Sequence, residues 1–114
     1  MSPLLVKQLL FGKLVISLLT KALELGYQFK LGDAKRDQRL FGVPGVRKGY
    51  GHPRSCHKIQ LALDLDLFKD GRYLGESEDH KELGLYWESL HPDCRWGGRF
   101  SDGNHYSLTH EGMA

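Results

Sequence analysis

The first apolar stretch of the chain has the period of a helix. Ser2 followed by Pro3 is a typical helix start and Gly26 a typical stop, so the pattern predicts one long helix over residues 3–25. On a helical wheel one side collects the polar positions Lys13, Ser17, Thr20, Lys21 and Glu24. The rest of the helix is predicted to face the core, through Leu5, Leu9, Leu10, Ile16, Leu19 and Leu23. A helix lying on a membrane surface is the alternative interpretation.

Two later segments alternate with a period of two residues. Residues 27–31 have the pattern of a half-buried strand. Residues 61–68 carry leucine at every second position, which predicts a strand with its leucines in the core. The Asp70-Gly71 pair has hairpin-turn chemistry, and residues 72–74 are predicted to form the returning strand.

The last third of the chain predicts a second helix and a short final strand. Ser77 is expected to cap the helix and Pro92 to stop it, with an apolar stripe of Leu83, Tyr86, Trp87 and Leu90. The final strand is expected over residues 106–108, and residues 33–54 are expected to be mostly loop. The prediction is a single α+β domain over residues 1–114, with an antiparallel sheet and two helices, because 114 residues do not supply two cores.

Composition narrows the function classes. A formal net charge of +2 without dense basic runs does not favour nucleic-acid binding. The two cysteines, Cys56 and Cys94, lack metal-knuckle spacing and are expected to be free thiols. Lys13, Lys21 and Glu24 interrupt the apolar N-terminal stretch, so neither an export signal nor a membrane span is expected. We expect a monomer made in the cytoplasm, without stable membrane insertion.

Histidines and carboxylates at strand ends are the candidate chemistry. His57 comes just before the leucine-rich strand, and Asp64 lies on the face of that strand opposite the leucines. His105 precedes the last strand and is the candidate third ligand of a zinc ion, whose fourth position would hold water. Asp102, three residues earlier, is a candidate general base, although a loop aspartate that caps its own backbone is the alternative. Trp96, beside two glycines, is a candidate for lining a cleft.

Several short strings resemble one family. The segment SCHKIQLALD, residues 55–64, resembles the Ser-x-His-x6-Asp signature of a zinc peptidase family. This family includes D-alanyl-D-alanine carboxypeptidases, D-Ala-D-Ala dipeptidases and phage L-alanyl-D-glutamate endopeptidases, and its fold resembles the Hedgehog signalling domain. Further strings follow in the family's order and resemble its phage endolysin branch: GDAKRD at 32–37, LFKDG at 67–71, YWESL at 86–90, WGG at 96–98 and DGNHY at 102–106.

The resemblance implies a role for each matched position. His57, Asp64 and His105 would bind Zn²⁺, and Asp102 would be the catalytic acid or base. Arg36 would hold a substrate carboxylate, and Ser55 would support the site by hydrogen bonding. One departure is Gln60, which stands where the family often has glycine. Another is Arg99-Phe100, which stands where an acidic residue and tryptophan often follow the glycine pair.

The implied activity is hydrolysis of peptides in peptidoglycan. The expected bond is L-Ala-D-Glu, cut by a phage endolysin that is made in the host cytoplasm and reaches the cell wall after release. A D-Ala-D-Ala carboxypeptidase would use the same zinc site. A non-catalytic protein that contains zinc and binds wall peptide is the alternative from another class.

Overall fold

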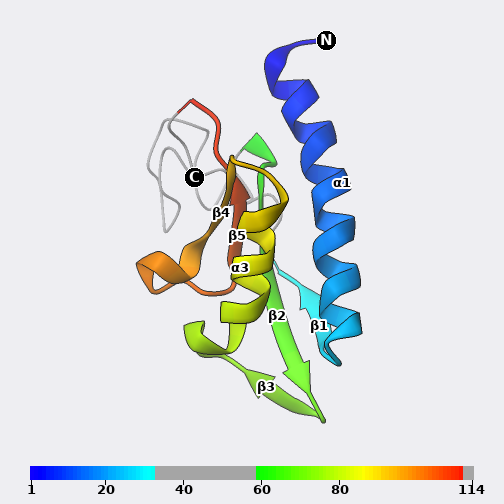
Figure 1. Cartoon of the computed structure of the whole chain (residues 1–114), viewed down its shortest axis with the longest axis vertical. Helices are drawn as coiled ribbons and strands as arrows, with labels where there is room; N and C mark the ends of the chain where they lie inside the picture. Colours follow the sequence, from blue (N-terminus) through cyan, green and yellow to red (C-terminus); the bar gives the residue numbers. More distant parts are fainter. Residues whose placement is uncertain (33–58, 112–114) are drawn as a thin grey trace, which may run out of the picture.

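The computed structural model describes residues 1–32 and 59–111 and places them in one α+β domain (Figure 1). Its elements are, in order, α1 (Pro3–Glu24), β1 (Gln28–Leu31), β2 (Ala62–Lys69), β3 (Arg72–Leu74), η2 (Ser77–His80), α3 (Lys81–Leu90), β4 (Cys94–Trp96), η3 (Gly97–Phe100) and β5 (His105–Leu108). The predicted class, an antiparallel sheet with a long N-terminal helix and a second helix, is confirmed.

The sheet has five strands built around β2. Its order is β1-β2-β5-β4, and β3 pairs with β2 through the predicted Asp70-Gly71 turn. All the pairings are antiparallel. Strand β5 pairs with the first half of β2, at Ala62 to Asp64. The strands that carry the predicted ligands Asp64 and His105 are therefore neighbours.

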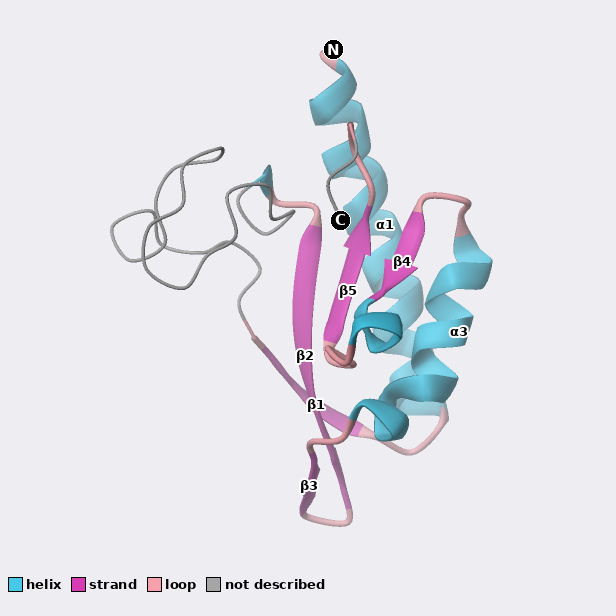
Figure 2. Ribbon diagram, turned by 90° about the vertical axis from the view of Figure 1, so that its left-hand side faces the viewer, coloured by secondary structure: helices cyan, strands magenta, loops and turns pink. Residues whose placement is uncertain are grey.

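The two helices cover one face of the sheet, and the predicted leucine face of β2 is confirmed. Figure 2 looks onto the other face, with α1 behind the strands. The leucines at 61, 63, 65 and 67 are buried, together with Leu18 of α1 and Leu83 and Trp87 of α3. Side chains alternate along a strand, so Asp64 and Asp66 point to the face that the helices leave uncovered.

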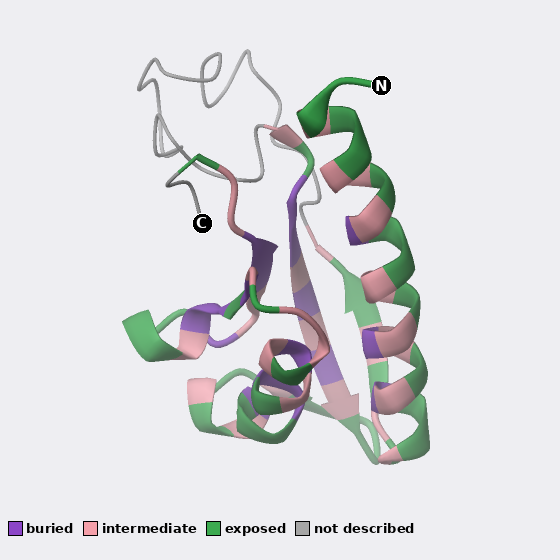
Figure 3. Ribbon diagram, turned by 45° about the horizontal axis from the view of Figure 1, so that its top comes forward, coloured by how far each residue is buried: buried purple, intermediate pink, exposed green. Residues whose placement is uncertain are grey.

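Helix α1 starts and ends as predicted, but its core-facing side is different from the prediction. Ser2 caps it by accepting a hydrogen bond of 3.1 Å from the amide of Leu5. The buried positions are Phe11, Leu18 and Ala22. Four of the residues predicted for the core are exposed, namely Leu5, Leu9, Ile16 and Leu23. Figure 3 shows the side of α1 that faces away from the sheet as mostly exposed. The wheel could not choose correctly because apolar residues occupy most of the helix circumference.

Helix α1 is also long enough to cross a membrane. It has 22 residues, and an 18-residue window within it has a mean hydropathy of 1.5. The charges of Lys13, Lys21 and Glu24 therefore do not take α1 below the length and hydropathy of a possible span, and the absence of stable membrane insertion stays a prediction. The same criterion is met by core helices of soluble proteins and by signal sequences, so it does not by itself place the chain in a membrane.

The start of the second helix and the strand after it also differ from the prediction. The helix begins as the 3-10 turn η2, where Glu76 is the N-cap and its amide donates a hydrogen bond of 3.1 Å to Asp79. The hydroxyl of Ser77, the predicted cap, instead accepts a hydrogen bond of 3.0 Å from the amide of Gly103. Strand β4 was not predicted, because a three-residue strand is too short for alternation to be recognised.

Candidate metal site

Asp64 and His105 meet on the sheet face that the helices leave uncovered. They are direct cross-strand partners in the β2–β5 pairing, so their side chains lie on the same face. The Nδ1 atom of His105 is 3.4 Å from Oδ1 of Asp64, and their side chains are 15% and 20% exposed. Two of the three ligands predicted from the sequence are therefore brought together.

The distance between these atoms suits two ligands of one metal ion. At 3.4 Å it exceeds the range of about 2.7–3.2 Å that is usual for an N–H···O hydrogen bond. Zinc–nitrogen and zinc–oxygen bonds are each about 2.0–2.2 Å, so a tetrahedral ion places the two donor atoms roughly 3.4 Å apart. One imidazole nitrogen and one carboxylate oxygen are also donor types that zinc accepts. These two residues thus have donor atoms and a spacing compatible with zinc, and they form an ion pair when His105 is protonated.

Two tryptophans fix the strand that carries His105. The indole Nε1 of Trp96 donates a hydrogen bond of 2.7 Å to the carbonyl of Gly103. The indole of Trp87 donates one of 2.9 Å to the carbonyl of Ser107. The two acceptors lie two residues before and two residues after His105, and both indoles are buried. Trp87 is in the core as predicted. Trp96 is 6% exposed, and its role in lining a cleft stays a prediction.

Asp102 lies in the turn that leads into β5. Its amide donates a hydrogen bond of 2.9 Å to the carbonyl of Gly97, and its carbonyl accepts one of 3.1 Å from the amide of His105. A Cβ atom at Gly97 would collide with the Asp102 carbonyl and with the Cβ of His105, so this turn requires glycine. Asp102 itself is exposed.

A buried histidine, to which the sequence assigned no role, lies behind the site. His80 Nδ1 and the hydroxyl of Tyr106 are hydrogen-bonded at 2.8 Å, and Tyr106 follows His105 in the chain. Burial lowers the pKa of His80, and the carboxylates of Asp79, Asp66 and Asp102 oppose this shift only in part. Burial also raises the pKa of the Tyr106 hydroxyl. A neutral pair therefore supports β5 from the core side.

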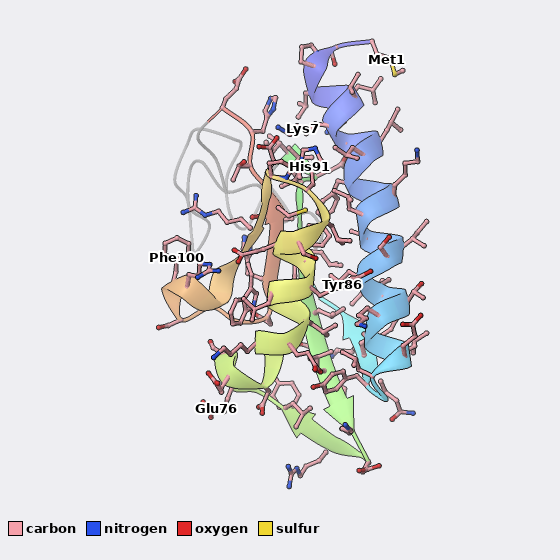
Figure 4. All side chains as sticks on the ribbon, viewed as in Figure 1. Met1, Lys7, Glu76, Tyr86, His91 and Phe100 are labelled. Atoms are coloured by element: carbon pink, nitrogen blue, oxygen red, sulfur yellow. The ribbon has the colours of Figure 1, made fainter. Side chains whose placement is uncertain are left out.

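Two further residues lie on the same sheet face as Asp64 and His105, and neither was predicted for the site. Arg95 belongs to β4, a strand that was not predicted, and Ser107 follows His105 in β5. Arg95 pairs directly with Ser107, which lies two residues after His105, so all three side chains are on one face. Arg95 is exposed, and its guanidinium carbon is 4.9 Å from the centre of the Phe100 ring. Figure 4 shows Phe100 on the side of the molecule away from α1. Ser107 is fully buried, and its hydroxyl has no hydrogen-bond partner among residues 1–32 and 59–111.

Gln60, which stands where the zinc peptidase family often has glycine, has a backbone conformation that favours glycine. Gln60, just before β2, has a φ of 59°, in the left-handed region that favours glycine. The departure from the family pattern therefore lies at a residue whose backbone suits glycine better than glutamine.

Three predicted site residues lie outside the described residues: the ligand His57, the supporting Ser55 and the carboxylate anchor Arg36. Within residues 1–32 and 59–111, no three His, Cys, Asp or Glu side chains gather as a metal-binding group. Cys94 is a buried free thiol, and burial raises its pKa to about 12.

Comparisons with known proteins found no relative of this chain. No family model matches the sequence, and neither the curated proteins nor the solved structures contain a significant match.

Proposed function

We propose that this chain is a zinc-dependent peptidase that cuts the peptide part of bacterial peptidoglycan. The single observation that carries the proposal is the pairing of Asp64 with His105 across two neighbouring strands, at the spacing of two ligands of one zinc ion. Both residues belong to the strings that resemble the wall-peptidase family. His57 is the proposed third ligand, and Ser55 is its proposed hydrogen-bonding support.

The proposed mechanism assigns one task to each residue. Bound zinc would supply a Lewis acid and lower the pKa of a coordinated water towards about 7. Asp102 would accept the proton of that water and later deliver it to the leaving amine. Its exposure and its backbone connection to His105 support this role.

The substrate would be oriented through its carboxylates. Arg36 is the residue proposed from the family resemblance. Arg95 is a further candidate among the described residues, because it lies on the same sheet face as His105 and is exposed. Its guanidinium is placed against Phe100, and the guanidinium fork matches a carboxylate such as that of D-glutamate.

The preferred bond is L-Ala-D-Glu, as in a phage endolysin that is made in the host cytoplasm and acts on the wall after release. Digestion of purified peptidoglycan, followed by mass analysis of the soluble fragments, tests this. We expect new amino termini on D-glutamate and full inhibition by a chelator. Release of free D-alanine would instead identify a carboxypeptidase. Zinc-dependent binding to the wall without fragments would identify a non-catalytic protein.

A matched pair of variants connects the activity to the site. Asp64→Asn removes the proposed ligand charge, whereas Asp66→Asn makes the same change on the same strand and face, two residues further along. Asp66 is 24% exposed and pairs only loosely with Lys30, at 3.9 Å. We expect loss of hydrolysis in the first variant and near-normal hydrolysis in the second. Equal activity of the two variants would contradict the proposed site.

A further inference from the structure

Two aromatic side chains lie on the same sheet face as Asp64, further along β2. Phe68 and Tyr73 are direct cross-strand partners in the β2–β3 hairpin, and their ring centres are 5.4 Å apart. Side chains recur on one face at every second residue of a strand, so Phe68 shares with Asp64 the face that the helices leave uncovered. We call Phe68 and Tyr73 the aromatic pair. Figure 1 shows β5, which carries His105, beside the upper part of β2, and β3 at the lower end of β2.

The aromatic pair presents a ring to solvent next to a polar side chain. Tyr73 is 57% exposed, and Phe68 is half-buried. A Cβ atom at Gly75 would come within 2.8 Å of Cε2 of Tyr73, so any side chain there would displace the ring. Gln28 of β1 pairs with Phe68 on the other edge of β2 and is exposed. An exposed aromatic ring is therefore combined with an amide that can donate and accept hydrogen bonds.

A sugar suits this combination of groups. One face of a pyranose ring is lined by C–H bonds, whose slight positive charge is attracted to the electron-rich face of an aromatic ring. The hydroxyl and acetamido groups at the edge of the sugar need hydrogen-bond partners. Gln28 can supply them, and so can Lys30, which lies on the same face of β1 with a side chain that is 74% exposed. A purely apolar partner would instead cover these polar groups without satisfying them.

We propose that the aromatic pair binds a sugar of the glycan strand to which the wall peptide is attached. This inference rests on the proposed function, because it takes the substrate to be a peptide of peptidoglycan. In peptidoglycan the peptide begins with L-alanine, which is joined to N-acetylmuramic acid through a lactyl group. The amino-terminal side of the L-Ala-D-Glu bond therefore leads to a sugar.

The distance along β2 matches this substrate. Phe68 follows Asp64 by four residues of an extended strand, which corresponds to about 13 Å. L-Alanine and the lactyl group together are about as long as two extended residues, roughly 7 Å. The width of the sugar ring makes up the remainder. A peptide whose scissile bond lies near Asp64 can therefore place its sugar on the aromatic pair.

Arg95 gives the bound substrate a direction. It pairs with Ser107, which in turn pairs with Ala62, so Arg95 lies level with the residue of β2 two positions before Asp64. The aromatic pair lies beyond Asp64 in the other direction along β2. The proposed carboxylate contact and the proposed sugar contact thus flank the bond to be cut, with D-glutamate towards Arg95 and the sugar towards Tyr73. The wall peptide carries its groups in this order.

Hydrolysis of two matched substrates by the full chain tests the proposal. One is a soluble muropeptide that keeps its disaccharide, and the other is the lactyl peptide that remains after base treatment removes the sugars. We expect kcat/KM to be at least about tenfold higher for the muropeptide. Tyr73→Leu should abolish this preference by slowing the muropeptide alone, whereas Tyr73→Phe keeps the ring and should keep the preference. A parent chain that cuts both substrates equally well would overturn the proposal.

A second tyrosine provides the matched control. Tyr86→Leu makes the same change on α3, in the helix layer, and should leave the preference for the muropeptide unchanged. Tyr73 is exposed, so its variants should keep a thermal unfolding midpoint close to that of the parent chain. A preference that Tyr73→Leu and Tyr86→Leu reduce equally would contradict a sugar site at the aromatic pair.

Binding of peptide-free glycan strands, followed by NMR titration of the full chain, separates this proposal from the proposed function. We expect binding that Tyr73→Leu abolishes. A chain that binds the strands in this way but cuts neither substrate would refute the peptidase and retain the sugar site. A chain that does not bind the strands, and cuts both substrates alike or not at all, would refute the sugar site.

Discussion

The indole nitrogen of Trp96 donates a 2.7 Å hydrogen bond to the carbonyl of Gly103, two residues before the proposed ligand His105. This bond, together with the one from Trp87 to Ser107, fixes the strand that carries the proposed metal ligand His105. Preorganisation of this kind lets a site hold its geometry before the ion binds.

Trp96→Phe should therefore weaken both the fold and the site. The variant removes the donor and leaves the buried carbonyl of Gly103 without its partner, at a cost of about 1–3 kcal/mol. We expect a lower free energy of unfolding in urea and a lower zinc affinity. Phe100→Leu, which changes an aromatic ring that is 62% exposed, is the control and should leave the free energy of unfolding nearly unchanged. Equal stability of both variants would contradict the structural role of the indole bond.

The buried His80 should make the fold sensitive to acid. Its pKa in the folded protein is lowered, chiefly by burial, from an unfolded value of about 6.5. The unfolded chain therefore binds more protons, and stability should fall as the pH drops below about 6.5, until the folded pKa is reached. His80→Gln should flatten this slope in urea unfolding measured between pH 7.5 and 5. His91→Gln, at a partly exposed histidine, should retain it. An NMR titration that places the pKa of His80 above 6.5 would refute the account.

Gln60 holds a left-handed backbone conformation at the entry to β2. Gln60→Gly should stabilise the protein by up to about 1 kcal/mol, because the relief of backbone strain slightly exceeds the added entropy of the unfolded chain. Asp70→Gly is the comparison, since Asp70 has a similar φ of 52° but aspartate tolerates this region better. We expect a smaller gain there. A larger gain at Asp70 than at Gln60, measured by thermal unfolding, would show that strain at Gln60 is unimportant.

Arg95 should affect substrate binding more than the chemical step. Arg95→Ala should raise KM for wall peptides about tenfold or more and change kcat little, because a carboxylate contact made equally in the ground and transition states affects binding alone. Arg95→Lys should restore part of the loss. Amidation of the D-glutamate carboxylate in the substrate should erase the difference between the variants. An unchanged KM in Arg95→Ala would remove this residue from the site.

The sequence predicted those features that depend on local pattern. Alternation in β2 gave the correct buried face, and the Ser2-Pro3 and Asp70-Gly71 pairs gave the correct helix start and turn. The outward side of α1 was wrong, because a helix that is apolar on most of its circumference does not reveal which stripe its neighbours cover. The predicted proximity of Asp64 and His105 is confirmed, but it depends on the antiparallel register of two distant strands, which periodicity does not contain. The role of His57 stays a prediction, since it lies outside the described residues.

Zinc titration of the purified chain, followed by calorimetry and metal analysis, tests the central claim most directly. The account predicts one zinc ion per chain and a loss of affinity of more than about 100-fold in Asp64→Asn and in His105→Ala. Asp66→Asn and His91→Gln should bind zinc like the parent chain. A chain that takes up no zinc, or whose zinc affinity is the same with and without the Asp64 and His105 side chains, would contradict the account.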